Sequence, residues 1–152
     1  MIEIQSLIEG TPNMTGQYKG DVTPKEAWDV LAQDKSAVLV DVRTFAEWKC
    51  VGVVDLSGLS KNSILIEWVS FPDGVPNTAF LSELSQAVPN KDTPIYFLCR
   101  GGIRSVGAAI AATDVGFRHS YNILEGFEGT PDEFGHRGRK TGWQGLSLPW
   151  KH

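Results

Sequence analysis

The stretch Pro94–Gly107, PIYFLCRGGIRSVG, places one cysteine between an apolar run and a cluster of glycines and arginines. The apolar residues 95–98 are typical of a buried strand. The small residues that follow the cluster predict a helix over about 105–115. Cys99 is therefore expected in a tight turn from a strand into a helix, where the positive helix N-terminus favours a reactive thiolate.

The glycines and arginines of this turn support the interpretation of a reactive thiol. Gly101 and Gly102 allow successive backbone N–H groups to turn inward and form an anion-binding nest. Arg100 and Arg104 either add two positive charges near the sulfur or are solvated surface charges. The same surroundings would hold an anion attached to the sulfur, such as a persulfide. The alternative is a buried structural thiol, because free cysteine is among the most buried residue types.

Strands alternate with helices along the chain. This order predicts an α/β fold with a mainly parallel central sheet of about five strands and helices on both faces. Thr23 and Thr44 are expected to cap the first two helices, and Pro24 and Glu26 support the first of them. The segment 64–69 fits either a strand or a buried helical turn. The other strands are expected at 18–22, 37–43, 53–56, 95–98 and 120–124, and the longer helices over 78–88 and 105–115.

Length and composition predict one folded domain. The chain has 152 residues, of which 41% are hydrophobic, and this is enough for a sizeable core. We expect a lead-in segment over 1–17 and a single domain over 18–152. The formal net charge of −4 argues against nucleic acid as the main partner, because neutralising phosphates needs a basic surface.

The cysteine content and the N-terminus favour a cytoplasmic protein. Two cysteines, Cys50 and Cys99, are too few for a disulfide framework. The N-terminal residues MIEIQSLIEG lack the basic region and the long apolar core of a signal peptide. No apolar run approaches the roughly 20 residues that span a bilayer. We therefore expect a reducing, cytoplasmic setting with free thiols and no membrane contact.

The Cys99 loop resembles that of a known family. The sequence CRGGIRS at Cys99–Ser105 is similar to the active-site loop of the rhodanese-like sulfurtransferases, often C-R-x-G-x-R-S. Upstream, DVRTFAEW at 41–48 resembles the family segment D-V-R-x-x-x-E-[FWY]. NILEG at 122–126 resembles the strand before the final family helix, and GW at 142–143 resembles that helix. The resemblance covers about residues 20–150 and implies a rhodanese-like fold.

The resemblance also implies a sulfurtransferase that works by double displacement. Cys99 would be the catalytic nucleophile, attacking the outer sulfur of a donor such as thiosulfate and forming a persulfide while sulfite leaves. A thiol, cyanide or a protein cysteine would then accept the sulfur. Neither a metal nor an organic cofactor is required, and no His, Cys and Asp cluster has metal-ligand spacing. The loop that binds the anionic substrate would consist of Arg100, Gly101, Gly102, Ile103, Arg104 and Ser105.

Three further residues are interpreted as structural supports of the site. Asp41, Arg43 and Glu47 match the family pattern. Arg43 and Glu47 are four positions apart, so we expect them either to pair on one turn or to tie the loop to the sheet. Cys50 is either a packed or partly exposed helix residue, which we prefer, or a resolving thiol for an oxidised Cys99.

The chain departs from the family pattern in three places. Gly52-Val53-Val54 stands where the family often has G-H-I, so a histidine at the rim is missing. The segments 57–78 and 128–141 are longer than a minimal domain needs. We expect both near the carboxyl edge of the sheet, where they would shape the substrate entrance. The second contains basic residues that attract an anionic partner or, as we prefer, form a solvated loop. These residues are His136, Arg137, Arg139 and Lys140.

Two alternative functions remain open at this point. Cysteine-dependent phosphatases and arsenate reductases also hold a thiolate in an anion cradle, with His before the cysteine and Arg six positions after it. Here Leu98 precedes Cys99 and Ser105 takes the sixth position. The loop is therefore shorter than in those enzymes. A shorter loop makes a tighter pocket, which suits a sulfur better than a tetrahedral phosphate. The other alternative is a persulfide carrier or interaction module for a protein partner.

Overall fold

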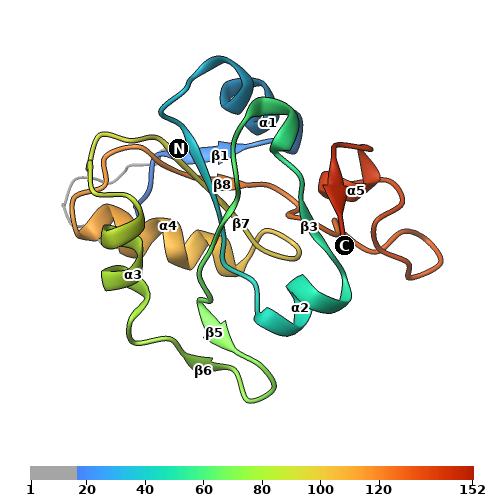
Figure 1. Ribbon diagram of the computed structural model, residues 1–152. Helices are drawn as coiled ribbons and strands as arrows, with labels where there is room; N and C mark the ends of the chain where they lie inside the picture. Colours follow the sequence, from blue (N-terminus) through green and yellow to red (C-terminus); the bar gives the residue numbers. More distant parts are fainter. Residues whose placement is uncertain (1–16) are drawn as a thin grey trace.

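A five-stranded parallel sheet forms the centre of the protein (Figure 1). This computed structural model describes residues 17–152, so the predicted lead-in over 1–17 lies outside the described residues except for its last position. The strand order is β1-β8-β7-β2-β4, and all neighbours run parallel. The predicted α/β fold is confirmed. The strands are β1 (Gly20–Val22), β2 (Val38–Asp41), β4 (Ile64–Leu65), β7 (Ile95–Leu98) and β8 (Ser120–Ile123).

Local sequence signals start and end the helices. Thr23 caps α1 and Thr44 caps α2, each in a capping box with Glu26 or Glu47, so these N-terminal N–H groups are satisfied within the chain. Gly116 follows α4 with a φ of 103°, a conformation that favours glycine. The helices are α1 (Pro24–Gln33), α2 (Phe45–Cys50), the 3₁₀ helix η1 (Ser57–Leu59), α3 (Phe80–Ala87), α4 (Arg104–Asp114) and α5 (Gly142–Gly145). Within residues 17–152, none of these helices combines the length and the apolarity needed to cross a membrane.

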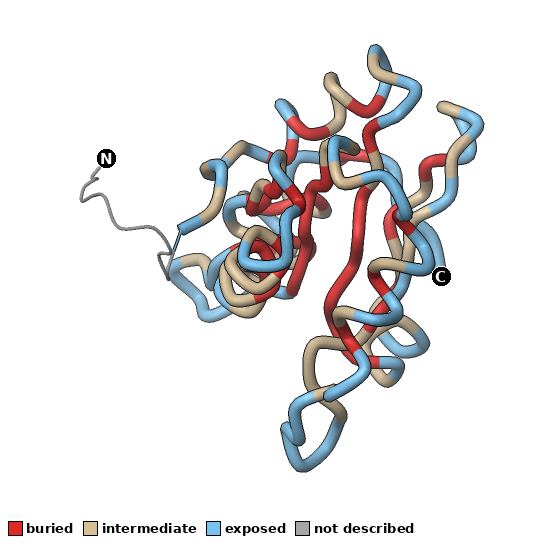
Figure 2. Tube along the Cα trace, turned by 90° about the vertical axis from the view of Figure 1, so that its left-hand side faces the viewer, coloured by how far each residue is buried: buried red, intermediate tan, exposed pale blue. Residues whose placement is uncertain are grey.

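Helices cover both faces of the sheet, because alternate residues of the central strands point to opposite sides. Val40 of β2 and Phe97 of β7 pack in one cluster with residues of α3 and α4. Leu39 and Leu98 pack in the other cluster, with residues of α1 and α5. Two buried faces explain why both strands are apolar nearly throughout. Figure 2 shows the resulting pattern, with buried strands in the middle and exposed segments around them.

The predicted strand over 53–56 forms, but it lies outside the central sheet. It is shortened to β3 (Val53–Val54) and pairs antiparallel with β9 (Trp150–Lys151). Gly52 makes this approach possible, since a Cβ at this position would lie 2.7 Å from the Lys151 carbonyl oxygen. The C-terminal strand therefore closes over the start of β3.

The predicted segment over 64–69 divides between two sheets. Its first residues form β4 at the edge of the central sheet, beside β2. Its last residue begins β5 (Val69–Ser70), which forms an antiparallel hairpin with β6 (Val75–Pro76). The hairpin projects from the bottom of the molecule in Figure 1, and its tip is exposed in Figure 2.

Candidate active site

Cys99 lies where the sequence places it, between the end of β7 and the start of α4. This is the carboxyl edge of the parallel sheet, where α/β folds bind their ligands. Helix α4 begins at Arg104, and no side chain caps its N-terminus. The first N–H groups of the helix are therefore available to an anion at the loop. Cys99 itself is 1% exposed, so the loop shields its side chain from bulk water.

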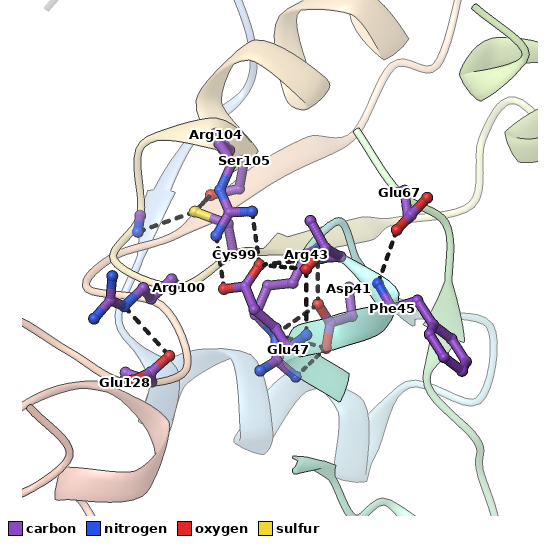
Figure 3. A network of polar contacts seen from close by, with 12 residues as sticks. Asp41, Arg43, Phe45, Glu47, Glu67, Cys99, Arg100, Arg104, Ser105 and Glu128 are labelled. Atoms are coloured by element: carbon purple, nitrogen blue, oxygen red, sulfur yellow. Dashed lines mark hydrogen bonds and ion pairs between the residues drawn. The ribbon is translucent and has the colours of Figure 1, made fainter. Parts of the chain in front are cut away.

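Two polar groups contact the sulfur of Cys99 (Figure 3). The backbone N–H of Gly102 donates to Sγ at 3.1 Å. The Ser105 hydroxyl oxygen lies 3.1 Å from Sγ, and Ser105 is fully buried. A backbone donor and a helix terminus aimed at one sulfur are suited to hold negative charge on it.

Backbone contacts fix the shape of the loop. Gly102 has a φ of 95°, and a Cβ there would lie 2.8 Å from the Glu125 backbone nitrogen, so a side chain would strain the turn. The segment after β8 runs beside the loop. Phe127 N–H donates to the Cys99 carbonyl at 2.8 Å, and Glu128 N–H donates to the Arg100 carbonyl at 3.0 Å. The loop is thus held against the end of β8 by main-chain hydrogen bonds.

Each arginine of the loop pairs with a carboxylate. Arg104 donates to both oxygens of Glu47, at 2.9 Å each (Figure 3). Arg100 lies 3.3 Å from Glu128. The two positive charges expected near the sulfur are therefore largely compensated by carboxylates. Burial raises the pKa of Glu47, but hydrogen bonds from Arg104 and Thr44 outweigh it, and the pKa lies below its ordinary value.

A second ion pair, between Asp41 and Arg43, is fully buried at the end of β2. Arg43 donates to Asp41 at 2.7 and 3.0 Å, and both side chains are 0% exposed. Arg43 also donates to the Gly52 carbonyl at 2.8 Å and stacks over the Phe127 ring at 4.2 Å. Of the two arrangements expected for Arg43 and Glu47, the pair on one turn does not form, because Glu47 pairs with Arg104 of α4 and Arg43 pairs with Asp41. The expectation of a structural tie holds for Arg43.

A cavity of about 420 Å³ opens beside the Cys99 loop. The β5–β6 hairpin forms one side of it, and α2 and the charged residues of the loop form the rest. The segments 57–78 and 128–141 both contribute to its lining, so both lie beside the Cys99 loop, as predicted; their role as a substrate entrance stays a prediction. The lining residues are Thr44, Glu47, Val51, Val69, Ser70, Phe71, Pro72, Gly74, Arg100, Arg104 and Glu128.

Comparison with known proteins identifies the family. The profile described as the STR4 middle domain matches residues 19–152. An uncharacterized protein of Rickettsia conorii is 36% identical over 131 residues, which cover 86% of this chain and 96% of that protein. The chloroplastic rhodanese-like domain-containing protein 4 of Arabidopsis thaliana is 29% identical over 133 residues, covering 86% of this chain and 25% of that protein. The chain belongs to the rhodanese-like family.

A solved structure agrees with this assignment. The crystal structure of Rv0390 from M. tuberculosis shares 49% sequence identity with the chain and superimposes with a TM-score of 0.81. The match covers 89% of this chain and 98% of that one. The rhodanese-like architecture therefore extends over nearly all of the described residues.

The remaining predicted residues take different places in this rhodanese-like domain. The side chain of Ile103 is 83% exposed at the tip of the loop. Gly101 lies beside Arg137, whose guanidinium nitrogen would be 3.3 Å from a Cβ added at the glycine. His136, by contrast, is exposed, so the basic cluster divides into one residue at the loop and others in solvent. Cys50 is an exposed free thiol at the end of α2.

Sequence reasoning does not identify Asn122 as a site residue. It is 1% exposed on β8, and Ser105 donates to its Oδ1 at 2.5 Å. The only sequence signal is a polar residue in an otherwise buried strand, and this signal does not reveal its partner. Among residues 17–152, no three His, Cys, Asp or Glu side chains are grouped so that they could hold a metal ion.

Proposed function

We propose that this rhodanese-like domain is a sulfurtransferase that carries sulfane sulfur on Cys99 as a persulfide. The observation that carries the proposal is the hydrogen bond from Gly102 N–H to the Cys99 sulfur at the uncapped start of α4. This arrangement stabilises negative charge on sulfur without a side-chain cation at the atom itself. Cys99 is the catalytic nucleophile, and Arg100–Ser105 is its anion-binding loop.

The transfer takes place in two displacements. The thiol first loses its proton to solvent. The Cys99 thiolate then attacks the outer sulfur of thiosulfate, a new S–S bond forms, and sulfite leaves with the electron pair of the broken S–S bond. In the second step an acceptor nucleophile attacks the terminal sulfur of the persulfide, and Cys99 leaves as a thiolate. Two easier covalent steps replace one difficult transfer.

A protein of the same fold has a related named activity. The polysulfide-sulfur transferase of Wolinella succinogenes shares the fold at a TM-score of 0.58 and 21% identity, over 86% of this chain and 76% of that one. At this identity the likeness concerns the fold. It supports the proposal because the fold accommodates sulfur transfer, and Cys99 with its loop supplies the nucleophile here.

The cavity favours a thiol acceptor over cyanide. About 420 Å³ beside the loop is much more than a small inorganic anion fills, and part of its wall is apolar. A low-molecular-weight thiol or the cysteine of a partner protein suits this space, so a persulfide carrier for a protein thiol is the second candidate function. A reducing, cytoplasmic setting fits both, because Cys50 and Cys99 are free thiols.

Intact-mass measurement after incubation with thiosulfate tests the proposal. The wild type and Cys50→Ser are expected to gain the mass of one sulfur atom, which cyanide then removes, and Cys99→Ser is expected to gain nothing. Sulfur found on Cys50 in place of Cys99 would overturn the mechanism. Rapid persulfide formation with slow release to every small acceptor would favour the carrier.

A further inference from the structure

A chain of polar contacts leads away from the sulfur of Cys99 to the edge of the sheet. Ser105 lies 3.1 Å from Sγ and donates to Asn122 Oδ1 at 2.5 Å. Asn122 Nδ2 in turn donates to Asp21 Oδ1 at 3.0 Å. Ser105 and Asn122 are at most 1% exposed, whereas Asp21 is exposed on β1. This series of polar contacts thus joins the Cys99 loop, β8 and β1 through side chains alone.

The carboxylate at the outer end determines the direction of each hydrogen bond. An ionised Asp21 only accepts, so Asn122 must turn its amide nitrogen toward it and its oxygen toward Ser105. Tyr18 donates to the same carboxylate oxygen at 2.8 Å. Burial, together with the hydrogen bond and charge of Asp21, raises the pKa of Tyr18 to about 12, so its hydroxyl stays a donor.

The single hydroxyl proton of Ser105 is then committed to Asn122. The oxygen of Ser105 can only accept from the Cys99 thiol, which is the neutral form of the nucleophile. We propose that Asn122, oriented by Asp21, is a positioning residue that keeps the Ser105 hydroxyl turned away from the sulfur and so restrains thiolate formation at Cys99. A thiolate gains the Ser105 donor only if the hydroxyl rotates and abandons Asn122.

The persulfide places a different demand on this contact. Its negative charge resides on the terminal sulfur, while Sγ becomes a neutral bridging atom that no longer needs a donor from Ser105. The hydroxyl can therefore stay on Asn122 in the persulfide state. The arrangement restrains the free thiolate and leaves the sulfur-loaded state undisturbed. No proton moves along the chain, because an amide neither gains nor loses one at neutral pH.

Other charged groups surround the same thiol. Arg104 on α4 pairs with Glu47 on α2, and Asp41 with Arg43 at the end of β2. On the loop itself, Arg100 pairs with Glu128. None of these contacts Asn122 or Asp21 in the described structure, so a substitution in the polar chain leaves them in place. A change in the titration of the thiol then reports on the Ser105 hydroxyl.

The inference deepens the proposed function, since it concerns the same thiol, but thiolate absorbance tests it whether or not sulfur is transferred. The measurement uses the full chain with Cys50→Ser, so that Cys99 is the one thiol. Asn122→Ala releases the Ser105 hydroxyl toward the sulfur. Asp21→Ala removes the acceptor of Asn122 Nδ2, so the amide can turn its nitrogen to Ser105 and the hydroxyl is released in the same way. The pH profile of the ultraviolet thiolate band is expected to move about one unit lower, a thiolate fraction on the order of tenfold higher at a given pH.

Two controls separate positioning from a general structural effect. In a Ser105→Ala background, Asn122→Ala is expected to leave the profile unchanged, because the group through which it acts is gone. Tyr18→Phe removes the other donor to Asp21 but leaves the carboxylate, so its profile should match the parent. An unchanged profile in Asp21→Ala, or a shift by Asn122→Ala or Asp21→Ala that persists without the Ser105 hydroxyl, would refute the inference. Asp21→Ala also tests the inference if Asn122→Ala does not fold, since Asp21 is exposed.

Discussion

Arg104 donates to both carboxylate oxygens of Glu47, at 2.9 Å each, although the two residues are 57 positions apart. The pair joins the first turn of α4 to the first turn of α2, and both residues line the cavity beside the Cys99 loop. Glu47 also compensates the positive charge of Arg104, which the sequence alone predicts to act on the Cys99 thiol. In the proposed function, the loop consequently binds its anion through backbone N–H groups and the helix terminus.

The Glu47–Arg104 pair predicts an acid-dependent contribution to stability. The pKa of Glu47 is lowered in the folded protein from an ordinary value of 4.5. A lowered carboxyl pKa stabilises the fold above the unfolded value, and this stabilisation is lost as the pH falls through the folded value. The difference in unfolding free energy between the wild type and Glu47→Gln should therefore be constant above pH 4.5 and shrink below it. Urea unfolding at a series of pH values measures it, and a difference that does not change with pH would contradict the assignment.

The Asp41–Arg43 pair predicts a large loss of stability when one partner is removed. Both side chains are 0% exposed, so Asp41→Asn leaves a buried guanidinium without its counter-ion. The expected cost is about 3–5 kcal/mol of unfolding free energy. Asp29→Asn is a matched control, because Asp29 pairs with Lys25 at the surface and should cost about 0–1 kcal/mol. Equal losses in the two variants, measured by chemical denaturation, would show that the buried pair is not a support of the loop.

The features that the sequence predicts correctly are those encoded by neighbouring residues. Thr23 and Thr44 start helices because the capping partner lies three positions away. The Cys99 turn follows from an apolar strand that runs into glycines. A period of hydrophobic residues or a short spacing is sufficient for each of these, and no knowledge of the tertiary structure is needed.

The features that escape prediction are contacts between distant segments or elements of two residues. Asn122 meets Ser105 only because β8 lies beside β7 in the sheet, an order that no spacing reveals. Glu47 has a local candidate partner in Arg43, yet tertiary packing gives it Arg104. The strands β5 and β6 have two residues each, which is too short for an alternating pattern, so the hairpin beside the cavity reads as an irregular segment.

The exposed hairpin predicts a difference between small and large acceptors. Phe71 lines the cavity and is 67% exposed, so it offers apolar surface to an acceptor that reaches beyond the sulfur. Phe71→Ser is expected to raise the KM of a bulky thiol about three- to tenfold, which corresponds to the free energy of burying part of an apolar side chain. The rate with cyanide should stay unchanged. Phe134→Ser is the control, because Phe134 is 74% exposed but does not line the cavity. Steady-state kinetics with both acceptors decide the matter, and an equal effect on cyanide would rule out acceptor recognition by the hairpin.

Arg137 predicts a site of attraction for the anionic donor. Its guanidinium lies beside Gly101 and donates to the Gly129 carbonyl at 2.5 Å, and within residues 17–152 it forms no ion pair with a carboxylate, unlike Arg100 and Arg104. An uncompensated cation at the loop raises the local concentration of a small dianion such as thiosulfate. Arg137→Gln is therefore expected to raise the KM for thiosulfate about three- to tenfold and to weaken its dependence on ionic strength. Arg139→Gln removes the same charge from an exposed position of the same segment and should change the KM little. Indistinguishable KM values for the two variants at low salt would show that the loop captures the donor without Arg137.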